Sequence, residues 1–275
     1  MFSRTVRPNA NKPGMSLAAM LVLAVLVYAA SSARGQEKKD DMPTPDPRVF
    51  KDADGNAMPY LVLTPKDYNP AKKYPLVLLY HGVGECGDDN KSQWTNGIEV
   101  FQKPENREKF PCFVVAPQCP KGKQWVNVPW SADSEIQPEQ PSDQLKLSLG
   151  ILTAVQKEFA IDADRLYVAG LSMGGFAVWD VITRHPDLFA AAMPICGGGD
   201  EKQAAKIAKL PLWAFHGGQD TVVKTFRSRN MIAAMKLAGG DPKYTEYPAE
   251  GHGSWTPAFH EPELLPWMFA QTRRR

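Results

Sequence analysis

Apolar segments of strand length alternate with helical segments through most of this 275-residue chain. The strand-like segments are MPYLVL (58–63), YPLVLLYHG (74–82), CFVVAP (112–117), RLYVAGL (165–171), FAAAMPICG (189–197), PLWAFHG (211–217) and YTEYPA (244–249). Several are apolar at both alternating positions, as expected when helices cover both faces of a sheet. The alternation predicts an α/β fold with a mostly parallel, doubly wound sheet.

Helices are predicted between the later strands. Leu145, Leu149, Leu152, Val155 and Phe159 recur at helical spacing and form one apolar stripe. Further helices are predicted at 175–184, 202–208, 224–238 and 262–271. No repeat and no break in composition divides residues 48–272, so we expect a single catalytic domain there.

The N-terminal segment has the composition of an export signal. Three basic residues precede the apolar run from Leu17 to Ala30, and the small residues of 31–33 follow it. A membrane-spanning helix needs about 20 apolar residues, so this run favours a cleaved signal over an anchor. We expect a signal peptide at 1–33, a charged, Pro-rich linker at 34–47 and a secreted or periplasmic mature protein without stable membrane association.

Charge excludes one class of partner. The chain has 32 Lys and Arg against 30 Asp and Glu, and part of the basic excess lies in residues 1–35 and in the C-terminal Arg273–Arg275. The interior is therefore slightly acidic, with no strongly basic stretch. Phosphate contacts need clustered Lys and Arg, so we expect no nucleic-acid partner.

Four cysteines do not make a disulfide framework. Cys112 and Cys119 flank a predicted strand whose seven residues place them about 23 Å apart, too far for a disulfide. Cys86 meets Cys119 only if their loops are neighbours. Free thiols are the default expectation.

The strongest motif is Gly170-Leu171-Ser172-Met173-Gly174, between a predicted strand and a predicted helix. This is the context of a nucleophile elbow, the sharp turn that exposes a catalytic serine. The alternative is a glycine-rich turn whose serine caps the helix. We interpret Ser172 as a nucleophile.

A serine nucleophile needs a base, and the base needs a carboxylate that orients it. Asp220 follows the strand PLWAFHG and His252 lies in a Gly-rich loop after YTEYPA, which gives the chain order serine, acid, histidine. Asp200 is the rival acid and His260 the weaker rival base. A metal site built from histidines at 81, 216 and 252 matches no ligand spacing, so we predict no metal.

Oxyanion stabilisation requires two N–H donors. The residue after the nucleophile, Met173, supplies one. The loop His81-Gly82-Val83-Gly84 after the strand PLVLLY supplies the other, and we choose Val83 over Gly84.

With these motifs the chain resembles the α/β-hydrolase superfamily. Within it, the chain is similar to exported carboxylesterases of the dienelactone-hydrolase-like and prolyl-oligopeptidase-like groups and to feruloyl and acetyl-xylan esterases. The resemblance covers about residues 48–272 and rests on HGVGECGDDN (81–90), APQCP (116–120), QW (124–125), DRLYVAGLSMGGFAVWD (164–180), PICGGGD (194–200), AFHGGQD (214–220) and GHGSW (251–255). It implies a Ser-Asp-His hydrolase without a cofactor, with the three roles on Ser172, Asp220 and His252. Cys86 departs from the arginine that relatives usually carry.

The predicted function is hydrolysis of small-molecule or polysaccharide-linked carboxylic esters through an acyl-enzyme. Trp125 and Gln118 are the expected substrate-binding residues, and Trp130 and Trp255 are further candidates for an aromatic subsite. A serine peptidase of the prolyl-oligopeptidase type is one alternative, although no propeller domain accompanies the motifs. A non-catalytic binding protein on a hydrolase scaffold is the other.

Overall fold

The computed structural model describes residues 42–273 together with Met1. Pro43–Arg275 is one compact unit. The predicted signal peptide at 1–33 and most of the linker at 34–47 lie outside the described residues. Within the described part of the chain, no helix is both long and apolar enough to cross a membrane.

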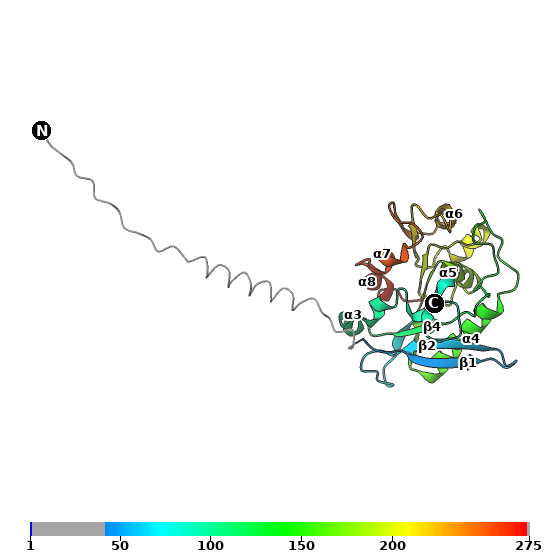
Figure 1. The fold of residues 1–275 in the computed structure, drawn as a ribbon, viewed down its shortest axis with the longest axis vertical. Coiled ribbons are helices and arrows are strands. Elements are labelled where there is room, and N and C mark those ends of the chain that lie inside the picture. The colour runs from blue at the N-terminus through cyan, green and yellow to red at the C-terminus, as the bar shows by residue number, and fades with distance from the viewer. Residues whose placement is uncertain (2–41, 274–275) are drawn as a thin grey trace. The chain divides into compact units, whose positions relative to one another are not determined.

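The described residues form an eight-stranded sheet in the order β1-β2-β4-β3-β5-β6-β7-β8 (Figure 1). The strands are β1 (Asp46–Lys51), β2 (Ala57–Leu63), β3 (Tyr74–Tyr80), β4 (Phe113–Pro117), β5 (Ile161–Leu171), β6 (Ala191–Ile195), β7 (Trp213–Gly217) and β8 (Lys243–Tyr247). The pairs β1–β2 and β2–β4 are antiparallel, and all other pairs are parallel. The predicted mostly parallel α/β sheet is confirmed.

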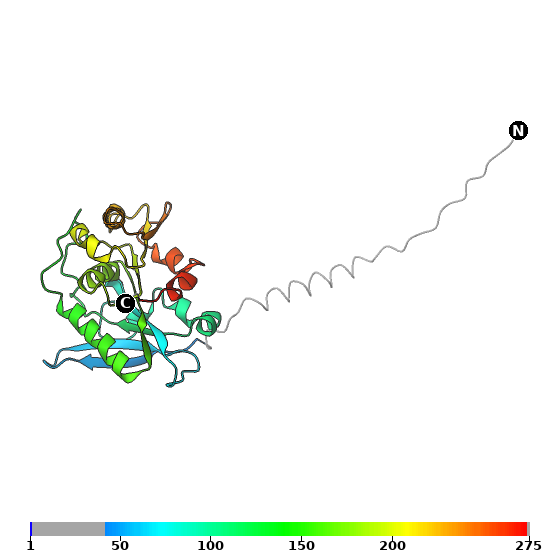
Figure 2. The ribbon, with the colours of Figure 1, turned by 180° about the vertical axis from the view of Figure 1, so that it is seen from behind.

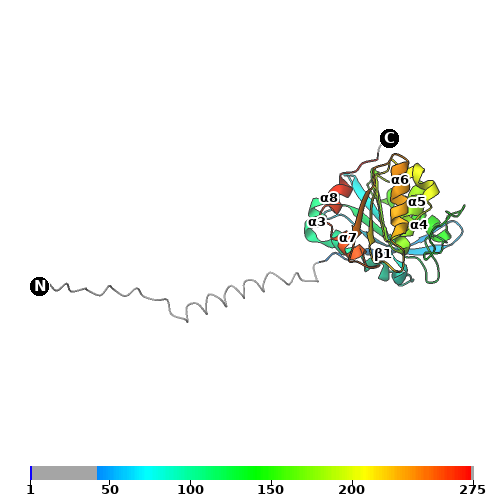
Figure 3. The same ribbon diagram turned by 90° about the horizontal axis from the view of Figure 1, so that it is seen from above.

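Helices cover both faces of this sheet (Figure 3). One face carries α4 (Asp143–Glu158), α5 (Met173–Arg184) and α6 (Phe226–Leu237), and the other carries α3 (Pro104–Lys109), α7 (Trp255–Phe259) and α8 (Leu264–Phe269). The short helix α2 (Glu99–Gln102) precedes α3.

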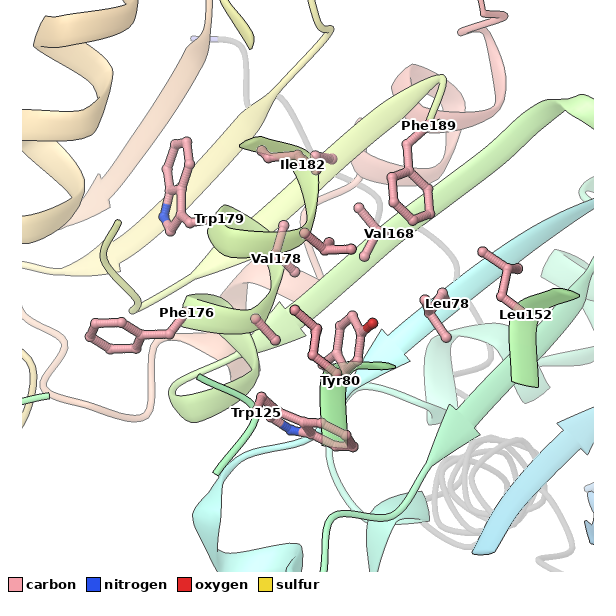
Figure 4. Close-up of a cluster of buried hydrophobic side chains, with 14 of the residues drawn as sticks. Leu78, Tyr80, Trp125, Leu152, Val168, Phe176, Val178, Trp179, Ile182 and Phe189 are labelled. Atoms are coloured by element: carbon pink, nitrogen blue, oxygen red, sulfur yellow. The ribbon is translucent and has the colours of Figure 1, made fainter. Parts of the chain in front are cut away.

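Each face of the sheet has its own buried core. Leu78 and Tyr80 of β3 belong to the cluster beneath α4 and α5, whereas Val77 and Leu79 belong to the opposite cluster. Figure 4 shows part of the first cluster, in which the rings of Tyr80 and Trp125 lie 5.0 Å apart between centroids. A strand with a core on both sides must be apolar at every position, which explains the continuous apolar run.

The predicted apolar stripe forms helix α4. Its N-cap, Ser142, accepts a hydrogen bond from the Leu145 amide, and extended backbone at Phe159 ends it. Leu145, Leu152 and Val155 are fully buried. The stripe therefore faces the core as expected.

Two elements differ from the sequence predictions. β1 begins at Asp46, inside the range assigned to the linker, and its Arg48 forms a 2.6 Å ion pair with Glu158 of α4. Figure 2 shows β1 and β2 as blue strands next to the green helix α4. The folded body thus begins before residue 48. The helix predicted at 202–208 is the 3₁₀ helix η4 (Glu201–Ile207), a form that proteins use in short pieces.

Candidate active site

Ser172 occupies a strained turn between β5 and α5. Its φ of 53° and ψ of −118° are rare for a residue with a side chain, and its amide donates to Ile195 O at 2.9 Å. A Cβ at Gly174 would lie 2.1 Å from Tyr80 O, so only glycine fits there. The Ser172 side chain makes no helix-capping hydrogen bond. The helix-cap alternative therefore does not describe this serine.

Ser172, His252 and Asp220 form a continuous hydrogen-bonded chain. Ser172 Oγ lies 2.8 Å from His252 Nε2, and His252 Nδ1 lies 2.7 Å from Asp220 Oδ2. The serine is 8% exposed and the Asp220 carboxylate is fully buried. In such a chain the imidazole can take the hydroxyl proton while the carboxylate holds the ring in place.

The Asp220 carboxylate is held in its ionised form. Burial alone would raise its pKa, but hydrogen bonds from His216 and His252 and from the amides of Val222 and Val223 outweigh burial and lower it. The two amides donate to Oδ1 at 2.8 and 2.9 Å, which leaves Oδ2 for the histidines. Asp220 therefore presents a fixed negative charge to His252.

His216 is a neighbour of this chain that the sequence did not assign to the site. Its Nε2 lies 3.0 Å from Val223 O. The same nitrogen lies 3.2 Å from Asp220 Oδ2. Strand β7 ends with His216-Gly217, four residues before Asp220. A contact across the loop 217–220 depends on how tightly that loop turns, which local sequence does not reveal.

The rival candidates lie in other environments. Asp200 caps η4 by accepting from the Lys202 amide and also accepts from the Gln137 amide. His260 is exposed and bonds Thr256 O. His81 is buried, which lowers its pKa to about 4, and its Nε2 accepts from the Cys119 amide. None of these three is hydrogen bonded to Ser172 or His252.

One group of potential metal ligands overlaps the same chain. Among the described residues, the ligand atoms of Cys196, Asp220 and His252 lie within 4.8 Å of one another. Asp220 and His252 are already hydrogen bonded to each other. We therefore assign this group to the serine-centred chain and not to a metal site.

The predicted oxyanion donors, Met173 and Val83, each begin a helix near Ser172. Met173 opens α5 and Val83 opens the 3₁₀ helix η2 (Val83–Glu85), so neither amide has a partner inside its own helix. The η2 loop lies against Ser172, since a Cβ at Gly82 would lie 3.6 Å from Ser172 Cβ. Both amides therefore belong to segments that border Ser172.

Trp125 and Gln118 do not take the expected substrate-binding role, because both side chains are fully buried. Trp125 Nε1 donates to His81 O at 3.1 Å, and Gln118 Nε2 donates to Glu85 O at 3.1 Å. They support the loop that carries Val83 and do not offer a surface to a substrate. Residue type alone did not show whether these side chains face solvent or core.

Two other tryptophans are partly accessible. The ring of Trp255 lies edge-on to His252, with centroids 5.4 Å apart. Trp130 lines a hollow of about 320 Å³ together with Val83, Cys86, Lys121, Lys123 and Gln124. An aromatic side chain, Trp130, and two cationic side chains, Lys121 and Lys123, thus lie next to the proposed oxyanion loop.

Comparisons with known proteins identify a family and several similar chains. The family model Esterase, described as "Putative esterase", matches residues 53–198, more than half of the chain. A crystal structure of a thermostable esterase is 39% identical, with a TM-score of 0.78, and the match covers 85% of this chain and 64% of that chain. A feruloyl esterase module from Clostridium thermocellum, 17% identical with a TM-score of 0.61, covers 86% of this chain and 91% of its own, and shares the fold.

Two curated relatives are more distant in sequence and longer than this chain. Feruloyl esterase B of Piromyces equi is 28% identical over 59% of this chain, and a bifunctional acetylxylan esterase/xylanase of Neocallimastix patriciarum is 28% identical over 56%. This chain spans only 29% and 20% of those two proteins. Because the family model matches more than half of its residues, the chain belongs to the Esterase family of α/β-hydrolases.

Proposed function

We propose that this protein is a serine carboxylesterase in which Ser172 is the nucleophile, His252 the general base and Asp220 the orienting acid. The observation that carries the proposal is the 2.8 Å contact between Ser172 Oγ and His252 Nε2 on a strained elbow. A hydroxyl is a weak nucleophile, and an adjacent imidazole that accepts its proton activates it. Membership of the Esterase family supports the reaction class.

The proposed reaction has two steps. Ser172 Oγ attacks the ester carbonyl carbon while His252 Nε2 takes the hydroxyl proton, and the carbonyl oxygen becomes an oxyanion. The amides of Met173 and Val83 stabilise that oxygen. The C–O bond to the alcohol breaks, His252 gives its proton to the leaving oxygen, and an acyl-enzyme remains. In the second step, water attacks the acyl carbon while His252 takes its proton. The bond to Ser172 Oγ then breaks, His252 returns the proton to Ser172, and the acid is released.

The proposed substrates are small-molecule or polysaccharide-linked esters, including feruloyl esters. The names of the relatives from Piromyces and Neocallimastix support this class. On the protein itself, Trp255 beside His252 and Trp130 in the neighbouring hollow are suited to stacking on aromatic or sugar rings.

The function is tested by hydrolysis rates on p-nitrophenyl esters of increasing chain length, methyl ferulate and an acetylated xylan. We expect turnover of esters and labelling of Ser172 by a fluorophosphonate probe. Absence of both ester turnover and labelling would contradict the proposal and favour a binding protein.

A peptidase is the second candidate because of one relative. Dipeptidyl-peptidase 5 of Porphyromonas gingivalis is 26% identical over 54% of this chain. A dipeptidyl p-nitroanilide, which releases p-nitroaniline, measured beside the p-nitrophenyl esters, separates the two activities. Faster turnover of the amide would favour the peptidase.

We also propose that residues 1–33 are a signal peptide and that the mature protein is secreted or periplasmic. The basic flank, the apolar run from Leu17 to Ala30 and the small residues after it support this. Mass spectrometry of the extracytoplasmic fraction should give an N-terminus between Arg34 and Gln36. An intact Met1 in the membrane fraction would instead show an anchor.

A further inference from the structure

The loop after β3 and the segment after β4 bring two thiols together. Cys86 ends η2, and Cys119 follows β4 by two residues. The Gly87 amide donates to Cys119 O at 3.0 Å, and the Cys86 and Cys119 thiols are close enough to shift each other's pKa. Both cysteines are free thiols in this structure.

We propose that Cys86 and Cys119 are a disulfide-forming pair, closed by a small disulfide oxidant such as glutathione disulfide. The bond would join the loop 81–90 covalently to the segment after β4.

The backbone hydrogen bond from Gly87 to Cys119 O places the two segments at a spacing compatible with a disulfide. Segments joined by an N–H···O bond run about 5 Å apart, and a disulfide needs Cα atoms about 4.4–6.8 Å apart. Two further contacts hold the segments in place, from Cys119 N to His81 Nε2 at 2.9 Å and from Gln118 Nε2 to Glu85 O at 3.1 Å. The pair is therefore held close by contacts that do not involve sulfur.

The two thiols differ in the way that a stepwise oxidation requires. Cys86 is partly exposed and Cys119 is fully buried. The hydrogen bond with Cys119 lowers the pKa of Cys86, whereas that same bond, followed by burial, raises the pKa of Cys119. Cys86 is thus the more accessible and more acidic thiol, and Cys119 is the resolving thiol.

The proposed oxidation takes place in two thiol–disulfide exchanges. The Cys86 thiolate attacks glutathione disulfide, forms a mixed disulfide and releases one glutathione thiolate. Cys119 then loses its proton, attacks the Cys86 sulfur and releases the second glutathione. The protein loses two electrons and two protons, and one glutathione disulfide is reduced to two thiols.

The other two cysteines are in different positions. Cys112 is buried at the start of β4, and burial raises its pKa to about 12. Cys196 is buried at the end of β6, with its backbone at a φ of 39°. Neither has a thiol partner among the described residues, which makes Cys112 a suitable control.

The pairing can be tested on the full chain without reference to its activity. Protein reduced with dithiothreitol is compared with protein incubated in glutathione disulfide, and both are blocked with iodoacetamide and digested with trypsin without reduction. Lys91 and Lys109 lie between the two cysteines, so a crosslink gives a linked peptide pair. We expect this pair in the oxidised sample and a melting temperature raised by about 5–10 °C.

Matched variants make the result specific. Cys86→Ser should abolish the linked peptide and the thermal shift on oxidation, whereas Cys112→Ser should keep both. Complete alkylation of Cys86 and Cys119 after oxidation, or a glutathione adduct on Cys86 that never resolves, would overturn the proposal. The peptide analysis reads sulfur chemistry alone, so its failure is distinguishable from failure of the esterase proposal.

Discussion

At the scale of single residues, the proposed mechanism depends on which carboxylate faces His252. Asp220 Oδ2 lies 2.7 Å from His252 Nδ1, while Asp200 caps η4. Asp220→Asn should lower kcat by about 10⁴, because the amide disturbs the tautomer and orientation of the imidazole. Asp200→Asn should cost far less. Steady-state rates of the two variants on one p-nitrophenyl ester test this difference. A larger loss in Asp200→Asn than in Asp220→Asn would assign the acid to the loop after β6.

The pH dependence of the rate belongs to the same residues. Only the neutral imidazole of His252 accepts the Ser172 proton, so kcat/KM should rise with pH through a single ionisation. Burial lowers the pKa of His81 to about 4, so His81 stays neutral throughout that rise. A profile measured between about pH 5 and pH 9 tests this. A rise that requires two protons, or no dependence on pH, would contradict it.

Residue types predicted the chain of Ser172, Asp220 and His252 better than they predicted its surroundings. The elbow is readable because a glycine-flanked serine between a strand and a helix has few other uses. Trp125 and Gln118 were misplaced because an indole or amide suits both a binding cleft and a buried hydrogen bond. The approach of Cys86 to Cys119 depends on loop geometry, which the sequence left open.

At the scale of elements, the segment between β4 and α4 is fastened to α5 and α6 by buried polar contacts. Arg227 of α6 lies 2.9 Å from Glu135 Oε2 and donates to Ala132 O at 2.8 Å. Gln137 Nε2 donates to Thr183 Oγ1 of α5 at 2.7 Å. The Arg227 side chain is fully buried and that of Glu135 is 5% exposed. This segment is therefore held by an ion pair that water does not screen.

Removing the cation should destabilise the protein in a pH-dependent manner. Burial raises the pKa of Glu135 to about 7 against the attraction of Arg227. A carboxyl group whose pKa is raised in the folded protein stabilises the fold most when it is protonated. That stabilisation is lost as the pH rises from the ordinary carboxyl pKa toward 7. Arg227→Met should cost about 3–5 kcal/mol at pH 8 and less at pH 5.

Urea denaturation at the two pH values measures that difference. Arg229→Met is the matched control, because Arg229 pairs with Glu246 at the surface and should cost at most about 1 kcal/mol. Equal losses for Arg227→Met at both pH values would show that Glu135 is not the group that senses the missing charge.

Elements were predictable where they are buried on both faces. β3 and β6 appear as continuous apolar runs because helices cover each side of the sheet. β1 was missed because DPRVFK is an exposed, charged edge strand with a proline, which reads like a linker. Its pairing with β2 and its Arg48–Glu158 ion pair come from tertiary structure.

At the scale of the whole domain, the parallel strands place the site at one edge of the sheet. The loops after β3, β5, β7 and β8 carry Val83, Ser172, Asp220 and His252. Carboxyl ends of parallel strands meet at a common edge, so residues far apart in sequence converge there. The sequence does not predict the order of the strands in the sheet, because that order depends on how the connections between strands pack against the sheet.

The most direct test of the central claim is the ester hydrolysis rate of Ser172→Ala beside the wild-type protein. We expect a fall in kcat of about 10⁴–10⁶, with an unchanged melting temperature and no fluorophosphonate labelling. An alanine variant that folds normally and keeps more than a few per cent of wild-type activity would contradict the assignment of Ser172 as the nucleophile.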